Sequence, residues 1–229
     1  MSMFPLVIKD FVSKEEAETI IEHLDPKTQE TPREGIAVAL GWRNSVEAMK
    51  AGISEPVCGD LPKDVSDLLD DVFNRTKSKF EEVFGHEAAL TQANYQNMTK
   101  GGKNDLHSDT TNLDGTPLQP DGTPEEMEWS GLIYLNDAKT EYEGGAIVFP
   151  NQGVELFPET GDFVLFPGDI EHVHLVTTVT SGERKNLVFF YGRPENVGSE
   201  KSFYNWQDMP PEEQQRIRDS VKEQHGEQN

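Results

Sequence analysis

A His-x-Asp pair and two further histidines far along the chain are the residues whose types and spacing could bind a metal. His107 and Asp109 are two positions apart, so on a strand both side chains would lie on one face. One imidazole from a distant segment, that of His172 or His174, would complete a set of two histidines and one carboxylate. This set fills half of an octahedron and leaves the other half open, as in non-haem iron(II) sites that activate oxygen.

A cation follows these histidines in the segment Gly182-Glu183-Arg184-Lys185. The planar guanidinium of Arg184 suits two-point capture of a carboxylate, so this segment could hold an acidic cosubstrate. Arg184 and Lys185 are adjacent and would point to opposite faces of a strand, which leaves Lys185 as the alternative. His172 and His174 are two positions apart on a presumed strand, so alternation does not choose between them.

Short strands separated by glycine turns must position these residues. The sequence indicates eight strands without intervening helices, near residues 88–98, 104–109, 129–136, 145–149, 153–157, 161–166, 172–180 and 185–192. This pattern predicts a double-stranded β-helix, the jelly roll of cupins. We expect an α+β fold in which N-terminal helices pack on one sheet of that core.

Two helices are predicted ahead of the strands. Ser13 and Glu16 form a capping box at the start of the first helix, and Pro26 is expected to end it. The second helix is expected to begin near Pro62, a favoured first-turn residue, and to stop at Gly85.

The remaining segments carry weaker signals. We expect a short strand at 4–12, loop over 27–60 with short structure around residues 42–49, a surface loop or lid over 110–128, and a polar helix over 210–223. The chain is interpreted as one domain, residues 1–229. Its parts are a helical support (1–87), a catalytic core (88–192) and a C-terminal extension (193–229).

Composition limits the possible partners and surroundings. The net charge of −22 argues against a nucleic-acid substrate and leaves solubility, salty surroundings or a cationic protein substrate as its role. Cys58 is the single cysteine, so an intrachain disulfide is excluded. The sequence shows no signal peptide and no apolar run near the ~20 residues that span a bilayer. We expect a soluble, intracellular protein of the cytoplasm with no membrane partner, and the oligomeric state stays open.

The segment from His174 to Arg184 resembles iron(II)- and 2-oxoglutarate-dependent dioxygenases of the prolyl 4-hydroxylase-like branch. In that family an iron-binding His is followed by Val, Gly, and Arg or Lys at fixed spacings, and His174, Val179, Gly182 and Arg184 match them. The resemblance spans about residues 88 to 192 and includes Tyr95, Gly101-Gly102, 132–136, 143–150 and 161–166.

The resemblance implies a site and a reaction. His107, Asp109 and His174 would bind Fe(II) and form the catalytic centre. Arg184 and the Tyr134 hydroxyl would bind the distal carboxylate of 2-oxoglutarate, with Tyr95 as a further cosubstrate residue. For Tyr134 the alternative is a purely structural buried tyrosine. The implied reaction consumes O2 and 2-oxoglutarate, releases succinate and CO2, and hydroxylates an unactivated C–H bond of a peptide or protein, peptidyl proline first. Ascorbate is the implied reductant.

Two other function classes stay open on the sequence. A cupin-type metalloenzyme, either a hydrolase or an isomerase with zinc or manganese, would use the same ligands but leave Arg184 and Tyr134 without a role. A non-catalytic binding module would keep only a vestigial site. Formation of succinate that depends on iron(II) separates both from the dioxygenase.

Overall fold

The computed structural model describes residues 4–28, 37–43, 55–56, 61–116 and 127–195. These all belong to the first of two units into which the chain divides, residues 1–197. Cys58, residues 117–126 of the expected loop, and the helix expected over 210–223 lie outside the described residues. Among the described helices, none is both long enough and apolar enough to cross a membrane.

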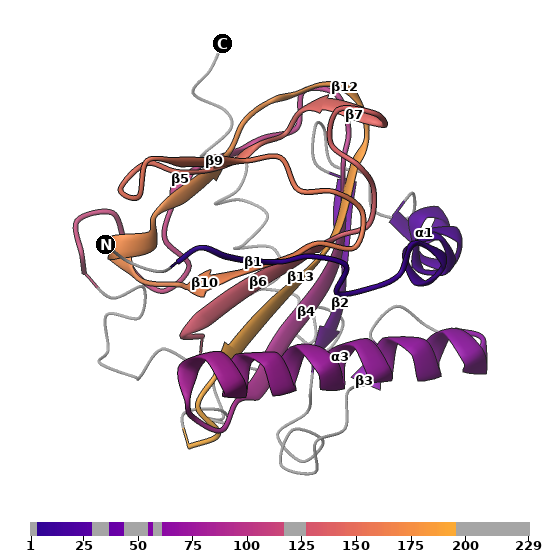
Figure 1. Cartoon of the computed structure of the whole chain (residues 1–229), viewed down its shortest axis with the longest axis horizontal. Coiled ribbons are helices and arrows are strands. Elements are labelled where there is room, and N and C mark those ends of the chain that lie inside the picture. The colour runs from indigo at the N-terminus through magenta and orange to yellow at the C-terminus, as the bar shows by residue number, and fades with distance from the viewer. Residues whose placement is uncertain (1–3, 29–36, 44–54, 57–60, 117–126, 196–229) are drawn as a thin grey trace, which may run out of the picture. The chain divides into compact units, whose positions relative to one another are not determined.

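The described strands form three antiparallel sheets (Figure 1). The large sheet has the order β1 (Leu6–Ile8), β10 (Phe163–Pro167), β6 (Trp129–Tyr134), β13 (Arg184–Gly192), β4 (Ala89–Met98), β2 (Ala37–Arg43), β3 (Glu55–Pro56). The second sheet has the order β5 (Asn104–His107), β11 (His174–Val176), β8 (Ile147–Phe149), β9 (Val154–Leu156). A two-stranded sheet pairs β12 (Val179–Gly182) with β7 (Tyr142–Gly144).

Alternating side chains of the large sheet face two different cores. In β10, Val164 and Phe166 belong to one apolar cluster, whereas Phe163 and Leu165 belong to another. The first cluster, which we call the inner core, also contains Ile147 of β8. The inner core therefore joins the large sheet to the four-stranded sheet. This two-sheet arrangement confirms the expected jelly roll.

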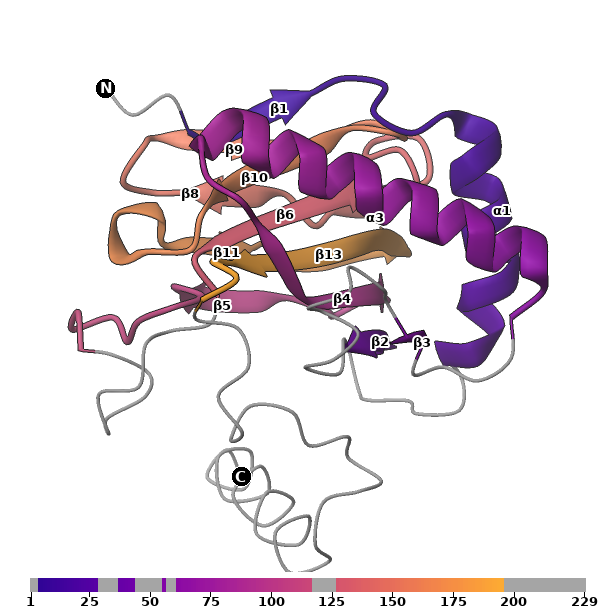
Figure 2. The ribbon, with the colours of Figure 1, turned by 90° about the horizontal axis from the view of Figure 1, so that it is seen from below.

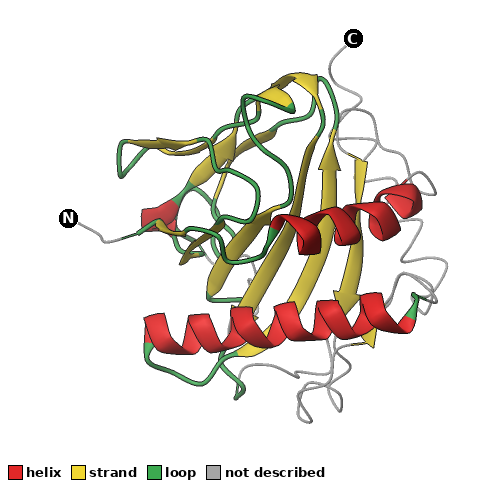
Figure 3. Ribbon diagram, turned by 45° about the vertical axis from the view of Figure 1, so that its right-hand side comes forward, coloured by secondary structure: helices red, strands yellow, loops and turns green. Residues whose placement is uncertain are grey.

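Two helices cover the opposite face of the large sheet (Figures 2 and 3). Helix α1 (Lys14–Thr28) begins with the predicted capping box: the Ser13 N–H donates to Glu16 (2.6 Å) and the Glu16 N–H donates to the Ser13 hydroxyl (3.1 Å). Helix α3 (Lys63–Phe84) ends at Gly85, whose φ of 70° suits a residue without Cβ. The apolar sides of both helices join the second cluster, the outer core.

Several expected elements differ in the structure. Helix α1 continues past Pro26 to Thr28, so the one helical hydrogen bond that proline removes does not end the helix there. Residues 37–43, expected to be loop, form β2 and pair with β4, so tertiary pairing outweighs weak local periodicity. The strand expected over 172–180 is broken: a 3-10 turn η1 (Ile170–His172) precedes β11, and β12 follows separately.

Candidate functional site

Three side chains with metal-binding atoms converge at one end of the four-stranded sheet. His107 ends β5 and pairs directly with His174, the first residue of β11. The Nε2 atoms of these histidines lie 3.5 Å and 3.8 Å from the Oδ1 and Oδ2 atoms of Asp109, respectively. The three ligand atoms lie within 4.8 Å of one another. This spacing suits three ligands of one small cation.

Backbone contacts orient both imidazoles for metal binding. The Nδ1 of His107 lies 2.7 Å from the Asp105 carbonyl oxygen, and the Nδ1 of His174 lies 3.1 Å from that of His172. A carbonyl oxygen only accepts hydrogen bonds, so each Nδ1 carries the hydrogen. Each Nε2 therefore turns its lone pair toward Asp109, which is the tautomer that a metal ion requires.

Asp109 is held by its side chain and its backbone. The Ser130 hydroxyl donates to Asp109 Oδ2 at 2.5 Å. The carbonyl oxygen of Gly168 accepts from the Asp109 and Thr110 N–H groups (both 3.1 Å) and from the Ser108 hydroxyl (2.7 Å). These bonds fix the turn after β5 and, with it, the direction of the carboxylate.

The electrostatics prepare two of the three groups for metal binding. Burial acts to raise the pKa of Asp109, but hydrogen bonds and the nearby imidazoles hold it below its ordinary value, so the carboxylate is ionised. Burial lowers the pKa of His174 and keeps that imidazole neutral. For His107, burial acts to lower the pKa, yet contacts with Asp109 and Asp105 raise it.

Arg184, the first residue of β13, is fully buried among neutral groups. Its Nη2 donates to the Tyr134 hydroxyl at 2.8 Å, and its Nη1 donates to Asn186 Oδ1 at 2.6 Å and lies 3.6 Å from the Met98 sulfur. Its guanidinium carbon lies 4.8 Å from the centre of the Tyr134 ring. Every partner of this cation among the described residues is neutral, which is unusual for a buried charge.

Three buried polar atoms near this guanidinium have no hydrogen-bond partner among the described residues: Nε of Arg184, Nδ2 of Asn186 and the hydroxyl of Tyr142. Such orphaned groups are rare in folded proteins and point to a bound partner. The surroundings carry one positive charge and several donors, so a carboxylate fits them. We call Met98, Tyr134, Tyr142, Arg184 and Asn186 the Arg184 cluster.

The inner core connects the metal ligands to the Arg184 cluster. Phe149 and Phe166 pack against the His174 ring, with ring centroids 5.5 Å and 4.7 Å away. Tyr134 belongs to the same apolar cluster as these two phenylalanines. A ligand that bridges the two sites would therefore lie against an apolar wall that keeps water out.

His174, and not His172, joins the ligand group. His172 lies in η1, where its Nδ1 contacts Asp169 Oδ1 at 2.6 Å and its ring packs edge-on against Phe4. The two histidines are thus not on one strand, so the premise that they share a face was wrong. The break between η1 and β11 separates them.

Arg184 and Lys185 point to opposite faces of β13, as expected from alternation. The ammonium of Lys185 lies 2.9 Å from carboxylate oxygens of both Asp25 and Glu183, on the side of α1. Lys185 is therefore already paired, whereas the Arg184 guanidinium has only neutral partners.

The structure does not bring Tyr95 to the Arg184 cluster. Tyr95 belongs to the outer core, and its hydroxyl donates to Asp25 at 3.0 Å. It pairs with Leu187 across the strands, and Leu187 is on the face of β13 opposite to Arg184. Met98, paired with Arg184 itself, is the β4 side chain that contacts the guanidinium.

Four residues of the site were not singled out from the sequence. Asn186 could have been, because it is two positions from Arg184 on the same strand. Met98, Ser130 and Tyr142 could not, since only strand register brings them to this face.

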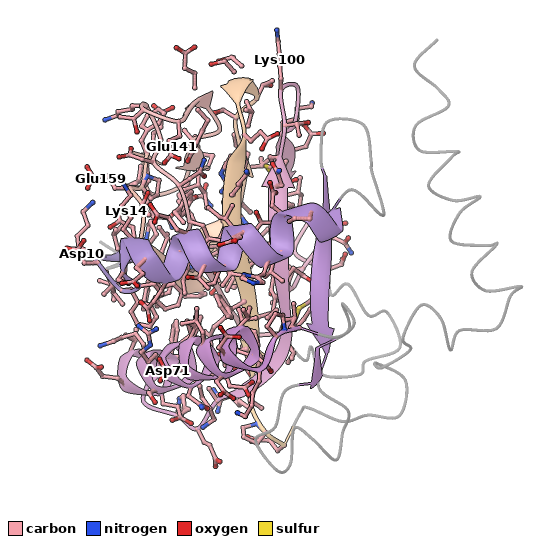
Figure 4. All side chains as sticks on the ribbon, turned by 90° about the vertical axis from the view of Figure 1, so that its right-hand side faces the viewer. Asp10, Lys14, Asp71, Lys100, Glu141 and Glu159 are labelled. Atoms are coloured by element: carbon pink, nitrogen blue, oxygen red, sulfur yellow. The ribbon has the colours of Figure 1, made fainter. Side chains whose placement is uncertain are left out.

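A groove of about 860 Å³ lies elsewhere, beside the start of α1. Asp10, Lys14, Glu141 and Glu159 are among its lining residues (Figure 4), and neither the metal ligands nor the Arg184 cluster line it. We assign it no role in the site.

Comparison with known proteins finds one matching family model. Residues 93–192, which include the three candidate ligands and Arg184, match the family model of the 2OG-Fe(II) oxygenase superfamily. No curated protein shows significant sequence similarity to the chain.

Solved structures share the fold at low identity. One is a viral collagen prolyl hydroxylase from Paramecium Bursaria Chlorella virus-1 in its 2OG complex, with 15% identity over 82% of this chain and 94% of that chain and a TM-score of 0.56. Another is an oxidoreductase of the 2OG-Fe(II) oxygenase family from Burkholderia pseudomallei, with 22% identity over 86% and 88% and a TM-score of 0.54. A third is a prolyl hydroxylase from Trichoplax adhaerens in complex with a hypoxia inducible factor peptide, with 16% identity over 84% of each chain and a TM-score of 0.53. Residues 93–192 of this chain are thus similar to the 2OG-Fe(II) oxygenase superfamily.

Proposed function

We propose that this protein is an iron(II)- and 2-oxoglutarate-dependent dioxygenase that hydroxylates a C–H bond of a peptidyl proline and releases succinate and CO2. One observation carries the proposal: a two-histidine, one-carboxylate group shares an apolar wall with a buried arginine whose described partners are all neutral. In this proposal ascorbate serves as the reductant. Residues 88–192 are the catalytic core, 1–87 support it, and 193–229 extend the same domain.

His107, Asp109 and His174 would hold the iron. Their donor set suits Fe(II), and three protein ligands leave three positions for a keto acid and oxygen. When bound, the iron supplies the oxidising chemistry, in which oxygen is used to decarboxylate the keto acid and to hydroxylate the substrate. The contribution of the chain is to fix the ligands, and the hydrogen bonds from Ser130 and to the two carbonyls do so.

Arg184 would bind the distal carboxylate of 2-oxoglutarate and thereby orient its keto end toward the iron. A carboxylate between the guanidinium and the unpartnered donors would neutralise a buried charge and satisfy the orphaned atoms. The Tyr134 hydroxyl, already 2.8 Å from Arg184 Nη2, can turn its own hydrogen toward the same carboxylate. The apolar side chains of Phe149 and Phe166 would exclude water from the path between the two ends.

A peptide substrate is supported by two features. Two of the solved structures with this fold are named as prolyl hydroxylases, and one of them was solved with a peptide fragment. The His107 side chain is 38% exposed, whereas those of Asp109 and His174 are 9% and 7% exposed. The His107 side is thus the approach to the metal for a large substrate. The net charge of −22 favours neutral or basic peptides.

The proposal is tested by incubating the iron-loaded protein with 2-oxoglutarate and a library of proline-containing peptides. We expect succinate to form only with iron(II), and one class of peptide to gain the mass of one oxygen atom on proline. Succinate without any modified proline would refute the substrate assignment and leave the dioxygenase. Absence of succinate with iron bound would refute the dioxygenase and favour a cupin-type hydrolase or isomerase. Iron-independent peptide binding that survives His107→Ala would favour a binding module.

A further inference from the structure

We propose that Tyr142 donates a hydrogen bond to the distal carboxylate of the keto acid, and that it makes the site select a carboxylate over a neutral group of the same size. This inference rests on the proposed function and goes beyond the roles of Arg184 and Tyr134 in it. Three features of Tyr142 lead to it: its unpartnered hydroxyl, its closeness to Arg184 and its protonation state.

The hydroxyl of Tyr142 is buried without a partner. Tyr142 is the first residue of β7 and only 3% of its surface is exposed. Its oxygen has no hydrogen-bond partner among the described residues. The hydroxyls of Tyr95 and Tyr191, which are also buried, both have partners. Leaving a buried hydroxyl unpaired is unfavourable, so Tyr142 is the exception that a ligand would explain.

Glycines place the Tyr142 ring beside Arg184. A Cβ at Gly145 would lie 3.2 Å from the Cε2 atom of Tyr142 and 3.0 Å from the Cδ atom of Arg184, so both side chains reach the same point. On the other side, a Cβ at Gly182 would lie 2.8 Å from the Tyr142 Cα atom. Both glycines have positive φ, 63° and 71°, and larger residues would displace the ring. The Tyr142 ring and the Arg184 stem thus both border the space beside Gly145.

The phenol of Tyr142 stays protonated in this place. Burial raises the pKa of Tyr142, and the positive charge of Arg184 lowers it by less. A protonated phenol can donate to an anion. Together with Nε of Arg184 and Nδ2 of Asn186 it makes three donors, and two carboxylate oxygens offer about four lone-pair sites. A terminal amide would turn its own N–H groups toward some of these donors, so the site should reject it.

The experiment compares Tyr142→Phe with Tyr191→Phe as the matched control. Tyr191 is an equally buried tyrosine, but its hydroxyl contacts the Thr76 hydroxyl at 2.7 Å and the Phe73 carbonyl at 3.2 Å in the outer core. Calorimetric titration of the full-length, manganese-loaded protein gives the affinity for 2-oxoglutarate without turnover. The same titration with 2-oxoglutaramate, in which an amide replaces the distal carboxylate, gives the selectivity. Thermal unfolding of the ligand-free protein gives the structural cost of each change.

We expect Tyr142→Phe to bind 2-oxoglutarate about 10–100-fold more weakly, the range for a hydrogen bond to a charged group, and to lose a similar factor of selectivity over the amide. Its ligand-free melting temperature should not fall, because the deleted hydroxyl had no partner. Tyr191→Phe should melt earlier and bind as the wild type does. If the wild type binds and Tyr142→Phe keeps its affinity and selectivity, this inference is wrong while the proposed function stands. Absence of 2-oxoglutarate binding by the wild type would overturn both.

Discussion

Replacing Arg184 with methionine should leave the stability of the ligand-free protein nearly unchanged. It should strongly reduce the stabilisation that 2-oxoglutarate gives. The Arg184 guanidinium is fully buried and its partners, Tyr134 and Asn186, are neutral. Methionine fills much of the volume of the arginine stem without the charge. Relief of an uncompensated buried charge opposes the loss of two hydrogen bonds, so the free energy of unfolding should stay within about 1 kcal/mol of the wild-type value.

The response to 2-oxoglutarate should change far more. Removing one member of a buried, hydrogen-bonded charge pair costs about 2–5 kcal/mol, which corresponds to a Kd at least ~30-fold higher. At a concentration of 100 times the wild-type Kd, 2-oxoglutarate should stabilise the wild type by about 2.7 kcal/mol and the variant by no more than about 0.9 kcal/mol. For a protein of this size these values correspond to melting-temperature rises of about 5–11 °C and at most about 2–4 °C.

The assay is thermal unfolding of the manganese-loaded protein with and without 2-oxoglutarate. Lys185→Met is the matched control, because Lys185 is the adjacent cation but pairs with Asp25 and Glu183 on the other face of β13. Lys185→Met should lose some stability and keep the full response to 2-oxoglutarate. Equal ligand-induced shifts in Arg184→Met and the wild type would refute the assignment of Arg184 as the carboxylate-binding residue.

Three further perturbations test other parts of the structure. Ser130→Ala removes the 2.5 Å hydrogen bond to Asp109 and should weaken iron(II) affinity about 10–100-fold in a metal titration; unchanged affinity would mean that the bond does not orient the carboxylate. Gly144→Ala should lower the free energy of unfolding, measured with denaturant, by more than Gly153→Ala does. Both glycines have positive φ, but only at Gly144 would a Cβ clash, since it would lie 2.0 Å from the Thr178 carbonyl oxygen. Equal losses of stability would contradict this packing. For Glu81, burial acts to raise the pKa, but hydrogen bonds from Lys77 and the Ala88 N–H outweigh it and lower the pKa. The stabilisation from Glu81 should therefore be full above pH 4.5, the ordinary pKa of Glu, and should vanish as the pH falls through the lower folded-state pKa. In Glu81→Gln the free energy of unfolding should depend less on pH over this range. The same pH dependence in the variant and the wild type would show that Glu81 contributes nothing.

The sequence predicts those parts of the fold that depend on local signals. The capping box at Ser13, the stop at Gly85 and most core strands follow from short-range chemistry, and the structure agrees with them. Strand β2 could not be predicted, because its pairing with β4 joins segments far apart in the chain. The two-position spacing of His107 and Asp109 places both at one site, although β5 ends at His107 and a turn, not a strand, carries Asp109.

The parts of the site that could not be predicted from the sequence have the same physical origin. Alternation along β13 correctly separates Arg184 from Lys185, since it concerns a single strand. Alternation does not predict which residue of β4 lies beside Arg184. The register between β13 and β4 pairs Arg184 with Met98 and not with Tyr95. For His172 the expectation depended on a continuous strand, and the 3-10 turn removed that basis.

The most direct test of the whole account is the stoichiometry and ligand dependence of iron(II) binding, measured anaerobically on the full-length protein. We predict one Fe(II) per chain, tighter binding when 2-oxoglutarate is present, and loss of both in His107→Ala, Asp109→Ala and His174→Ala but not in His172→Ala. Iron binding that survives in Asp109→Ala, or that does not respond to 2-oxoglutarate in the wild type, would contradict the account.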